Sequence, residues 1–335
     1  MPSAYVETPF ARVKLHSERL LVLAPPEPGK PDELLQQIPV ADLERLILHE
    51  QVQITTQAVC ALFRASVPLH YIDTHGHQLG ASLPPAAPDT AFRLRQYRRT
   101  LDTEFAISLA RRLVQAKIPN QHRLLQKANA NRPRGIETEL EQFPAFQTQA
   151  GTMDNLDQLR GVEGASTVLY FRLWAQFLPP EFPFERRSSR PPGNPVNACI
   201  SFGSALVYQE VVAAIHLRGL DPGLGLLHQT ENDRWSLALD LMEPFRPAIM
   251  EALTLRLFSQ QILKASDFEP AHGGIYLNQS GRRTYLQHYE RRLQREFMSE
   301  PLAHRTSLRQ QLQQQVLSYK KALEEPDAFT PFRLN

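Results

Sequence analysis

The chain has 335 residues, which favours two domains, or one large and one small, with room for a sizeable core. Its composition, 42% hydrophobic and 21% charged, is typical of an ordinary globular protein, and the +2 net charge means that a nucleic-acid surface would need unevenly distributed charge. No apolar run approaches the ~18 residues of a membrane span and the N-terminus has no signal-peptide character, so we expect a cytoplasmic protein with reduced, buried thiols at Cys60 and Cys199.

Short β-type runs alternate with turns before residue 85. We expect strands at residues 11–15, 19–23, 43–48 and 68–73, with a hairpin connection at residues 16–18. Residues 55–65 are predicted to be the single helix of this region, because Ala58, Leu62 and Phe63 share one face. The pattern predicts a small sheet or sandwich over residues 1–84.

The proline-rich stretch at residues 84–88 is the candidate linker, and the sequence after it is helical almost throughout. We expect helices at residues 92–117, 152–177 and 198–217, and a loop at the proline- and arginine-rich residues 179–195, to which we assign no role. A last apolar stripe consists of Leu308, Leu312, Val316, Tyr319 and Leu323. The predicted fold class is therefore α+β, with a small β-rich, sandwich-like domain (1–84) followed by a larger all-α domain (85–335).

Two acids and a histidine stand in unusual surroundings in the second half of the chain. Glu163 follows an apolar stripe and should point into the interior or a cleft, and His228 follows a turn-forming stretch at residues 221–225. Asp240 and Glu243 are three residues apart and would share a helical face, and the prolines after Glu243 should break or kink that helix.

Each of these residues also has an ordinary alternative. A single histidine is usually at the surface or a satisfied core group, and the two acids could form a solvated acidic face. The apolar neighbours of Asp240 and Glu243 favour burial instead, and a buried carboxylate must be paired or bind a metal. Oxygen and nitrogen donors without a thiolate suit Mg²⁺ or Mn²⁺ better than structural zinc, and so few ligands leave positions open for phosphate oxygens.

Other chemical motifs have less support. Residues 73–77 (Asp-Thr-His-Gly-His) alternate possible ligands, but the glycine favours a hairpin turn with exposed imidazoles. Residues 201–204 lack the nucleophile elbow of a serine hydrolase, and no phosphate-binding glycine loop follows a strand.

Arginines cluster at three places in the predicted helical region. These clusters are Arg95, Arg98 and Arg99; Arg186, Arg187 and Arg190; and Arg291, Arg292 and Arg295. The first and third would each lie on one helical face, whereas the second lies in the loop. Nearby Glu104 and Glu290 leave open that some arginines are simply ion-paired. Around a metal site, such clusters would fit binding of a phosphate backbone.

Five motifs in order carry a family resemblance. They are residues 159–164, 194–198 together with 201–203 and Tyr208, 219–228, 236–247 and 281–290. With these motifs the sequence resembles the CRISPR-associated integrase of spacer acquisition, CRISPR-associated protein one. The resemblance implies that Glu163, His228 and Glu243 bind Mg²⁺ or Mn²⁺. It also matches Asp240 to a second acid beside the ligands or on the substrate side, and Tyr208 to a tyrosine near the active site.

The resemblance implies the rest of the biology. The N-terminal domain would form the homodimer, and the helical domain would join a DNA 3′-hydroxyl to a phosphodiester of a CRISPR repeat. A small dimeric CRISPR-associated partner would bridge two integrase dimers on double-stranded prespacer DNA, giving a heterohexamer. The alternatives are a non-catalytic DNA scaffold and a metal-dependent nuclease without integration activity. The sequence does not reveal the CRISPR subtype or whether the chain is natively part of a larger fusion.

Overall fold

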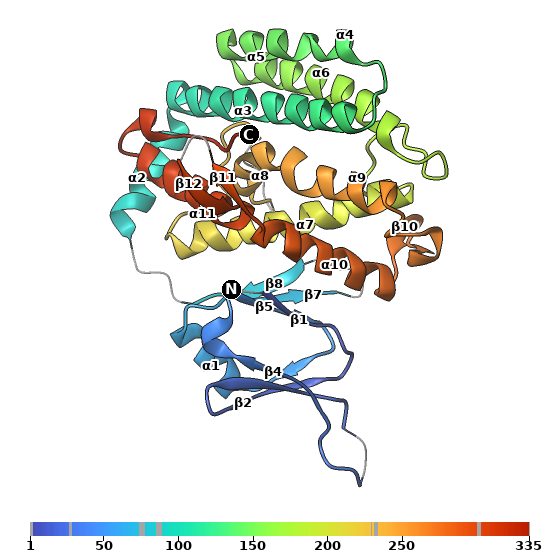
Figure 1. Ribbon diagram of the computed structural model, residues 1–335. Coiled ribbons are helices and arrows are strands. Elements are labelled where there is room, and N and C mark those ends of the chain that lie inside the picture. The colour runs from blue at the N-terminus through green and yellow to red at the C-terminus, as the bar shows by residue number, and fades with distance from the viewer. Residues whose placement is uncertain are drawn as a thin grey trace. The chain divides into compact units, whose positions relative to one another are not determined.

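A computed structural model describes residues 3–26, 29–73, 78–84, 89–228, 230, 234–299 and 303–334. Contacts within the chain divide it into two units, Met1–Pro88 and Asp89–Asn335 (Figure 1). Residues 85–88 of the predicted linker lie outside the described residues, so the domain boundary between residues 84 and 85 stays a prediction.

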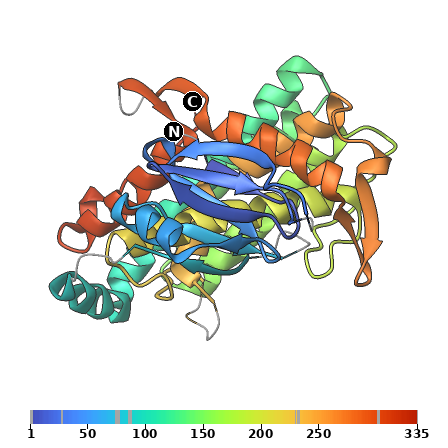
Figure 2. The same cartoon turned by 90° about the horizontal axis from the view of Figure 1, so that it is seen from below.

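In its described residues, the first unit consists of two four-stranded sheets, one α-helix and a 3₁₀ turn, η1 (Val40–Asp42) (Figure 2). One sheet has the order β1-β5-β7-β8 and the other β4-β3-β2-β6. The elements are β1 (Ser3–Val6), β2 (Arg12–His16), β3 (Arg19–Leu23), β4 (Leu34–Pro39), β5 (Arg45–His49), β6 (Gln53–Ile54), α1 (Thr56–Arg64), β7 (Leu69–Ile72) and β8 (Gln78–Ser82). Buried residues of both sheets, such as Val13 and Leu46, belong to one core. The predicted sandwich-like character is therefore confirmed.

The connection between β2 and β3 shows how the sequence sets this register. Ser17 and Glu18 both have positive φ, 44° and 61°, and His16 pairs with Arg19. A two-residue turn with positive φ at both positions matches the twist of the strands that it joins. By contrast, β1, β4, β6 and β8 were not predicted. The first four residues of β4 are exposed, so this strand lacks the alternating apolar pattern that reveals a strand in sequence.

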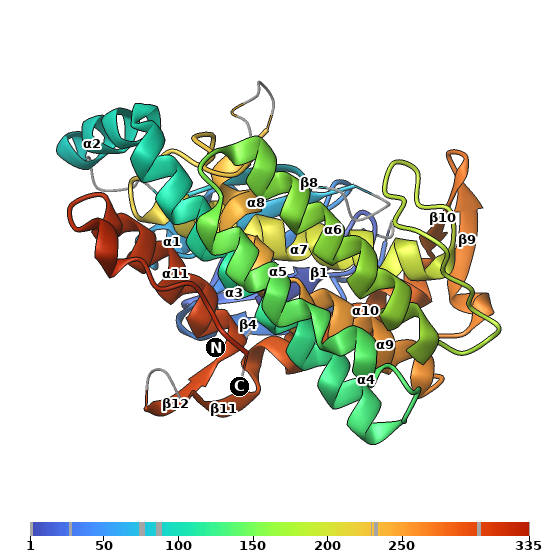
Figure 3. The ribbon, with the colours of Figure 1, turned by 90° about the horizontal axis from the view of Figure 1, so that it is seen from above.

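The second unit is mostly helical, and α3, α5 and α6 lie side by side in it (Figure 3). Its helices are α2 (Thr90–Leu101), α3 (Thr103–Asn131), α4 (Glu137–Leu140), α5 (Gln142–Thr152), α6 (Leu156–Trp174), α7 (Pro195–Leu217), α8 (Ser236–Met242), α9 (Ala252–Ser259), α10 (Gln279–Gln294) and α11 (Leu308–Ala322). Short turns of 3₁₀ helix include η3 (Glu243–Phe245) and η6 (Pro326–Ala328), and η4 (Pro247–Glu251) is a turn of π-helix.

Two sequence predictions for this unit need correction. The helix expected at residues 92–117 is interrupted at Asp102, whose Oδ1 accepts hydrogen bonds from the N–H groups of Glu104 and Phe105 at 3.1 and 3.2 Å and so begins α3. The unit is also not all-α. It contains the hairpins β9–β10 (Phe268–Ala271 and Gly274–Leu277) and β11–β12 (Glu296–Ser299 and His304–Ser307).

Helix α7 is long and apolar enough to cross a membrane by length and composition, contrary to the expectation that no such run exists. Of its most apolar stretch of 18 residues, 67% are buried inside the protein. Helices α8, α9 and α11 pack against it, so α7 is a core helix of this unit. Cys199 is buried in α7 as predicted. Cys60, however, is exposed on α1, so the prediction that both thiols are buried is wrong.

Candidate functional site

Two of the three predicted ligands meet at one buried ammonium group. Glu163 lies on α6, Glu243 begins η3, and Lys117 lies on α3. Lys117 Nζ contacts Glu163 Oε1 and lies 2.5 Å from Glu243 Oε2. The side chains of Lys117 and Glu243 are only 6% and 9% exposed. The two carboxylates therefore already surround a positive charge, in a place where water screens little.

The charges around Glu243 keep it ionised despite its burial. Burial alone would raise its pKa, but Lys117, Arg246 and His228 lower it to about 2. Burial likewise opposes the charge of Lys117, yet Glu243 and Glu163 raise its pKa above the ordinary value. Arg246 Nη1 lies 3.6 Å from Glu243 Oε1 and adds a second cation. Glu243 is thus held in the anionic form that metal binding requires.

His228 is held by Asp240. Asp240 Oδ1 lies 2.5 Å from His228 Nδ1, and the carboxylate also accepts hydrogen bonds from the N–H groups of Leu226, Leu227 and His228 at 2.5, 3.0 and 3.0 Å. Burial opposes the charged imidazole, but the bond to Asp240 and the charges of Asp240 and Glu243 outweigh it, so the pKa of His228 is raised. With Nδ1 engaged, Nε2 is the ring nitrogen that can face a ligand.

Regular α-helix does not extend across both Asp240 and Glu243, as their expected common face assumed. α8 ends at Met242, one residue before Glu243, and the chain continues as 3₁₀ and then π-helix. Pro244 and Pro247 have no N–H to donate to an α-helical ladder, as the sequence predicted. Asp240 consequently faces the loop at residues 226–228, whereas Glu243 faces Lys117.

A tight loop backs this arrangement. A Cβ at Gly225 would collide with the carbonyl oxygen of His228 and with the side chain of Ser236. Only glycine allows the loop to fold back this closely, which brings the N–H groups of residues 226–228 onto Asp240. The turn-forming stretch before His228 thus has a defined role in placing the imidazole.

The residues present fit a divalent cation by their chemistry. In the described part of the chain no three histidine, cysteine or acidic side chains are placed closely enough to hold an ion, because Lys117 lies between the two glutamates. Glu243 Oε2 lies 2.5 Å from Lys117 Nζ, so the ammonium group already engages this oxygen. Two anionic carboxylates and an imidazole nitrogen are suitable donors for Mg²⁺ or Mn²⁺.

The first arginine cluster is largely engaged within the chain. Arg95 pairs with Glu324, and Arg99 Nε donates to the carbonyl of Leu323 at 3.2 Å, so both fasten α2 to the end of α11. Arg98 is exposed. The ion-paired alternative therefore applies to Arg95, and DNA binding by this cluster stays a prediction.

The other two clusters also contain arginines that are hydrogen-bonded within the chain, and the third cluster contains exposed arginines as well. Arg291 and Arg295 are exposed, whereas Arg292 Nε donates to the carbonyl of Ala248 at 2.6 Å, and burial together with the charge of Arg256 lowers its pKa to about 10. In the loop at residues 179–195, Arg187 donates to Asn197 Oδ1 at 2.8 Å and to Ser201 Oγ at 3.1 Å. That arginine fastens the loop to α7.

Tyr208 has a structural contact close to the site. Its hydroxyl accepts a hydrogen bond from the N–H of Trp235 at 3.1 Å, so it fixes the residue that precedes α8. A role for Tyr208 toward DNA stays a prediction. Residues 74–77 of the predicted alternating motif lie outside the described residues.

Sequence reasoning missed Lys117 and Arg246, the two cations of the site. A lysine or arginine in a helix is usually solvated, so neither residue type attracts attention. The only available signal was the setting of Lys117 between Ala116 and Ile118, in a helix whose buried positions are mostly apolar.

Comparison with known proteins gives a consistent family. The family model for CRISPR associated protein Cas1 matches residues 4–291. A CRISPR-associated endonuclease Cas1 of Thermus thermophilus is 33% identical over 296 residues, which are 88% of this chain and 90% of that protein. A Cas4/Cas1 exonuclease–endonuclease fusion of Rhodospirillum rubrum is 32% identical over 321 residues. That match covers 93% of this chain but only 54% of the fusion protein, so the chain corresponds to about half of the fusion.

Solved structures share the fold. A CAS1 protein from Thermotoga maritima superposes with a TM-score of 0.81 at 24% identity, covering 96% of this chain and 97% of that one. A chain of a Cas6-RT-Cas1–Cas2 complex superposes with a TM-score of 0.80 at 24% identity, covering 100% of this chain and 36% of the other. The β-rich unit followed by a mostly helical unit is therefore the fold of this family.

Proposed function

This chain belongs to the CRISPR-associated Cas1 family, and we propose that it is a metal-dependent DNA integrase and endonuclease. Glu163, His228 and Glu243 would hold the metal, Mg²⁺ or Mn²⁺. The observation that carries the proposal is the pair of anionic glutamates around one buried cation, next to an imidazole oriented by a fully buried aspartate.

The reaction would be a transesterification. A DNA 3′-hydroxyl loses its proton and its oxygen forms a bond to phosphorus in the target strand. The phosphorus bond to the leaving 3′-oxygen breaks at the same time, and the leaving oxygen gains a proton, so no net proton is released. A divalent cation at the site would act as a Lewis acid on a phosphate oxygen and offset the negative charge that develops. Water as the nucleophile would instead give strand cleavage, so one site can support both activities.

The residues of this chain would each have a defined task. Asp240 fixes the orientation of His228 and leaves Nε2 directed away from the aspartate. Lys117 and Arg246 lower the repulsion between the glutamates, and they would add positive charge beside a phosphate bound at the site.

The partners proposed here follow from the family. The substrates would be double-stranded prespacer DNA and the leader and repeat of a CRISPR array. The first unit would form the homodimer, and a small dimeric Cas2 partner would join two such dimers into a heterohexamer. The fold shared with a chain of a Cas6-RT-Cas1–Cas2 complex supports this choice of partner.

An integration assay tests the function. Labelled prespacer duplex, a supercoiled plasmid bearing the repeat, Mn²⁺ or Mg²⁺ and the Cas2 partner are mixed with wild-type protein, Glu163→Gln, His228→Ala or Glu243→Gln. Because the ligands act together, we expect each variant to lose strand joining and nicking by at least about 100-fold, while DNA affinity is retained. Glu104→Gln, an exposed acid on α3, is the matched control and should behave as wild type.

The products separate the two candidate chemistries. Transfer of label into the plasmid supports the integrase, whereas nicking without transfer supports a nuclease alone. Wild-type rates of transfer in Glu243→Gln would show that the proposed ligand set is wrong.

A further inference from the structure

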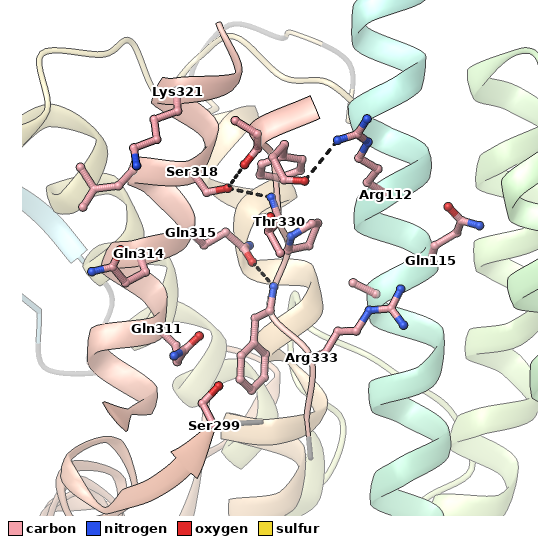
Figure 4. Close-up of a pocket in the computed structure, with 16 residues that line it drawn as sticks. Arg112, Gln115, Ser299, Gln311, Gln314, Gln315, Ser318, Lys321, Thr330 and Arg333 are labelled. Atoms are coloured by element: carbon pink, nitrogen blue, oxygen red, sulfur yellow. Dashed lines mark hydrogen bonds between the residues drawn. The ribbon is translucent and has the colours of Figure 1, made fainter. Parts of the chain in front are cut away.

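The C-terminal segment, residues 329–334, lies between α3 and α11 (Figure 4). Two buried amide side chains bind it. Gln315 of α11 accepts a hydrogen bond from the N–H of Phe332 at 2.7 Å. Asn120 of α3 donates to the carbonyl of Phe332 at 3.0 Å and accepts from the N–H of Leu334 at 2.8 Å. The segment is therefore fixed as a backbone strip between two helices.

The same two amides also reach the backbone on either side of Glu243. Asn120 Nδ2 donates to the carbonyl of Pro244 at 2.7 Å, and Gln315 Nε2 donates to the carbonyl of Leu241. Next to these bonds, the ring of Phe332 stacks on Phe245, with centroids 4.4 Å apart and planes at 9°. The C-terminal strip and the residues around Glu243 thus share both of their amide partners and one ring contact.

The hydrogen bonds from Asn120 and Gln315 provide N–H donors to backbone carbonyls in a segment where two prolines have none. η3 is a single 3₁₀ turn followed by a π turn, and neither Pro244 nor Pro247 can donate an N–H to a preceding carbonyl. Asn120 and Gln315 are 1% and 3% exposed, so water cannot replace them as donors. The orientation of the peptide groups at residues 241–245, and with it the direction of the Glu243 side chain, depends on these two amides.

We propose that residues 329–334, together with Asn120 and Gln315, form a positioning element that sets the placement of Glu243 and thereby the affinity of the site for a divalent cation. This inference rests on the proposed function. The strip lies beyond residue 291, where the match to the family model ends, so the family match assigns it no role. None of these residues touches Lys117 or Glu163 in a described contact, so they would act only through the backbone that carries Glu243.

Manganese binding tests the inference without relying on activity. Free Mn²⁺ is measured by electron paramagnetic resonance during titration of the full-length protein, without DNA. We expect Asn120→Ala and Phe332→Ala each to weaken Mn²⁺ binding by about 10-fold, the low end of the loss seen when groups behind metal ligands are removed. In nicking assays the same variants should need correspondingly more Mn²⁺ for half-maximal rate, with the rate recovering at high Mn²⁺.

Asn129→Ala is the matched control. Asn129 is a buried amide on the same helix, and it donates to Glu137 Oε1 at 2.7 Å and accepts from the N–H of Arg134 at 2.7 Å. It is bonded to the loop after α3 and not to the segment around Glu243. Its loss should lower thermal stability without changing the Mn²⁺ dissociation constant.

The outcomes separate this inference from the function on which it rests. If Glu243→Gln weakens Mn²⁺ binding while folded Asn120→Ala and Phe332→Ala bind as wild type, the positioning role is overturned and the metal site stands. If Glu243→Gln binds Mn²⁺ as wild type, the site itself is wrong. If Asn129→Ala weakens binding as much as Asn120→Ala, the effect is general destabilisation and the inference fails. Should Asn120→Ala not fold, Phe332→Ala decides the matter.

Discussion

At the scale of single residues, Lys117 governs the charge balance of the site. It is the one side chain in contact with both Glu163 and Glu243 among the described residues, and it is almost fully buried. Removing one partner of a buried ion pair leaves an uncompensated buried charge. The resulting loss of folding stability is much larger than the net stabilisation that the intact pair provides. The site therefore depends on a positive charge between its carboxylates, whether or not a metal is bound.

Replacement of Lys117 by methionine tests this dependence. We expect Lys117→Met to destabilise the metal-free protein by about 3 kcal/mol, since the buried carboxylate of Glu243 and the partly buried one of Glu163 lose their shared cation. Mn²⁺ should raise the melting temperature of this variant more than that of wild type, because an ion can take over the role of the missing ammonium group. Thermal melts with and without Mn²⁺ measure both effects. Equal shifts in the two proteins would mean that the ion binds away from Lys117.

The predicted site residues differ in how far sequence could place them. Glu163, His228 and Glu243 were found because apolar neighbours, glycines and prolines made their surroundings unusual. The role of Asp240 as the partner of His228 was out of reach, because it depends on a loop closing around Gly225 and on α8 ending at Met242. Spacing along the chain describes only regular helix, and Glu243 lies just past the end of one.

At the scale of elements, helices α7, α10 and α11 are joined by a buried charge network. Arg309 of α11 donates to Glu210 of α7 at 3.0 and 3.2 Å and to Glu290 of α10 at 3.0 and 3.1 Å. Tyr289 adds a hydrogen bond to Glu210 at 2.8 Å. Glu290 therefore binds Arg309, a partner that the sequence did not suggest.

We expect Arg309→Met to cost about 3–5 kcal/mol of stability, because it leaves two largely buried carboxylates without their cation. Arg305→Met is the matched control. Arg305 pairs with Glu296 at 3.2 Å, and both side chains are more than 60% exposed, so its loss should cost at most about 1 kcal/mol. Urea unfolding at neutral pH measures the difference. If the two variants lose similar free energies of unfolding, burial does not make the ion pairs of Arg309 more important for stability than the exposed pair of Arg305.

Regular elements were predictable where one face is apolar, as in α11, whose stripe is buried as expected. The helix break at Asp102 carried a recognisable signal, since aspartate is a strong N-terminal cap, but the absence of glycine and proline masked it. The hairpins β9–β10 and β11–β12 have strands of only four residues with no regular apolar alternation, so no local pattern describes their pairing.

At the scale of the whole molecule, a net charge of +2 means that DNA binding must come from local groups of cations. Several arginines in the three clusters fasten the chain to itself, through Glu324, Leu323, Ala248 and Asn197. Those arginines are unsuitable for testing DNA binding, because substituting them would also loosen the fold. Arg291 and Arg295, one helical turn apart at the end of α10 and both exposed, are the better candidates.

Arg291→Glu combined with Arg295→Glu should therefore weaken DNA binding without unfolding the protein. Each phosphate that an arginine neutralises contributes about 0.9 to the slope of log affinity against log salt, so we expect a slope shallower by about 2 if both residues bind phosphates. Fluorescence anisotropy of a labelled duplex between about 50 and 200 mM salt measures the slope, and a second duplex of unrelated sequence should give the same change. Arg305→Glu, an exposed reversal elsewhere in this unit, shows how much one charge reversal away from α10 changes the slope. A slope unchanged by the double reversal would exclude this face of α10 from the DNA path and leave exposed Arg98 as the next cation to test.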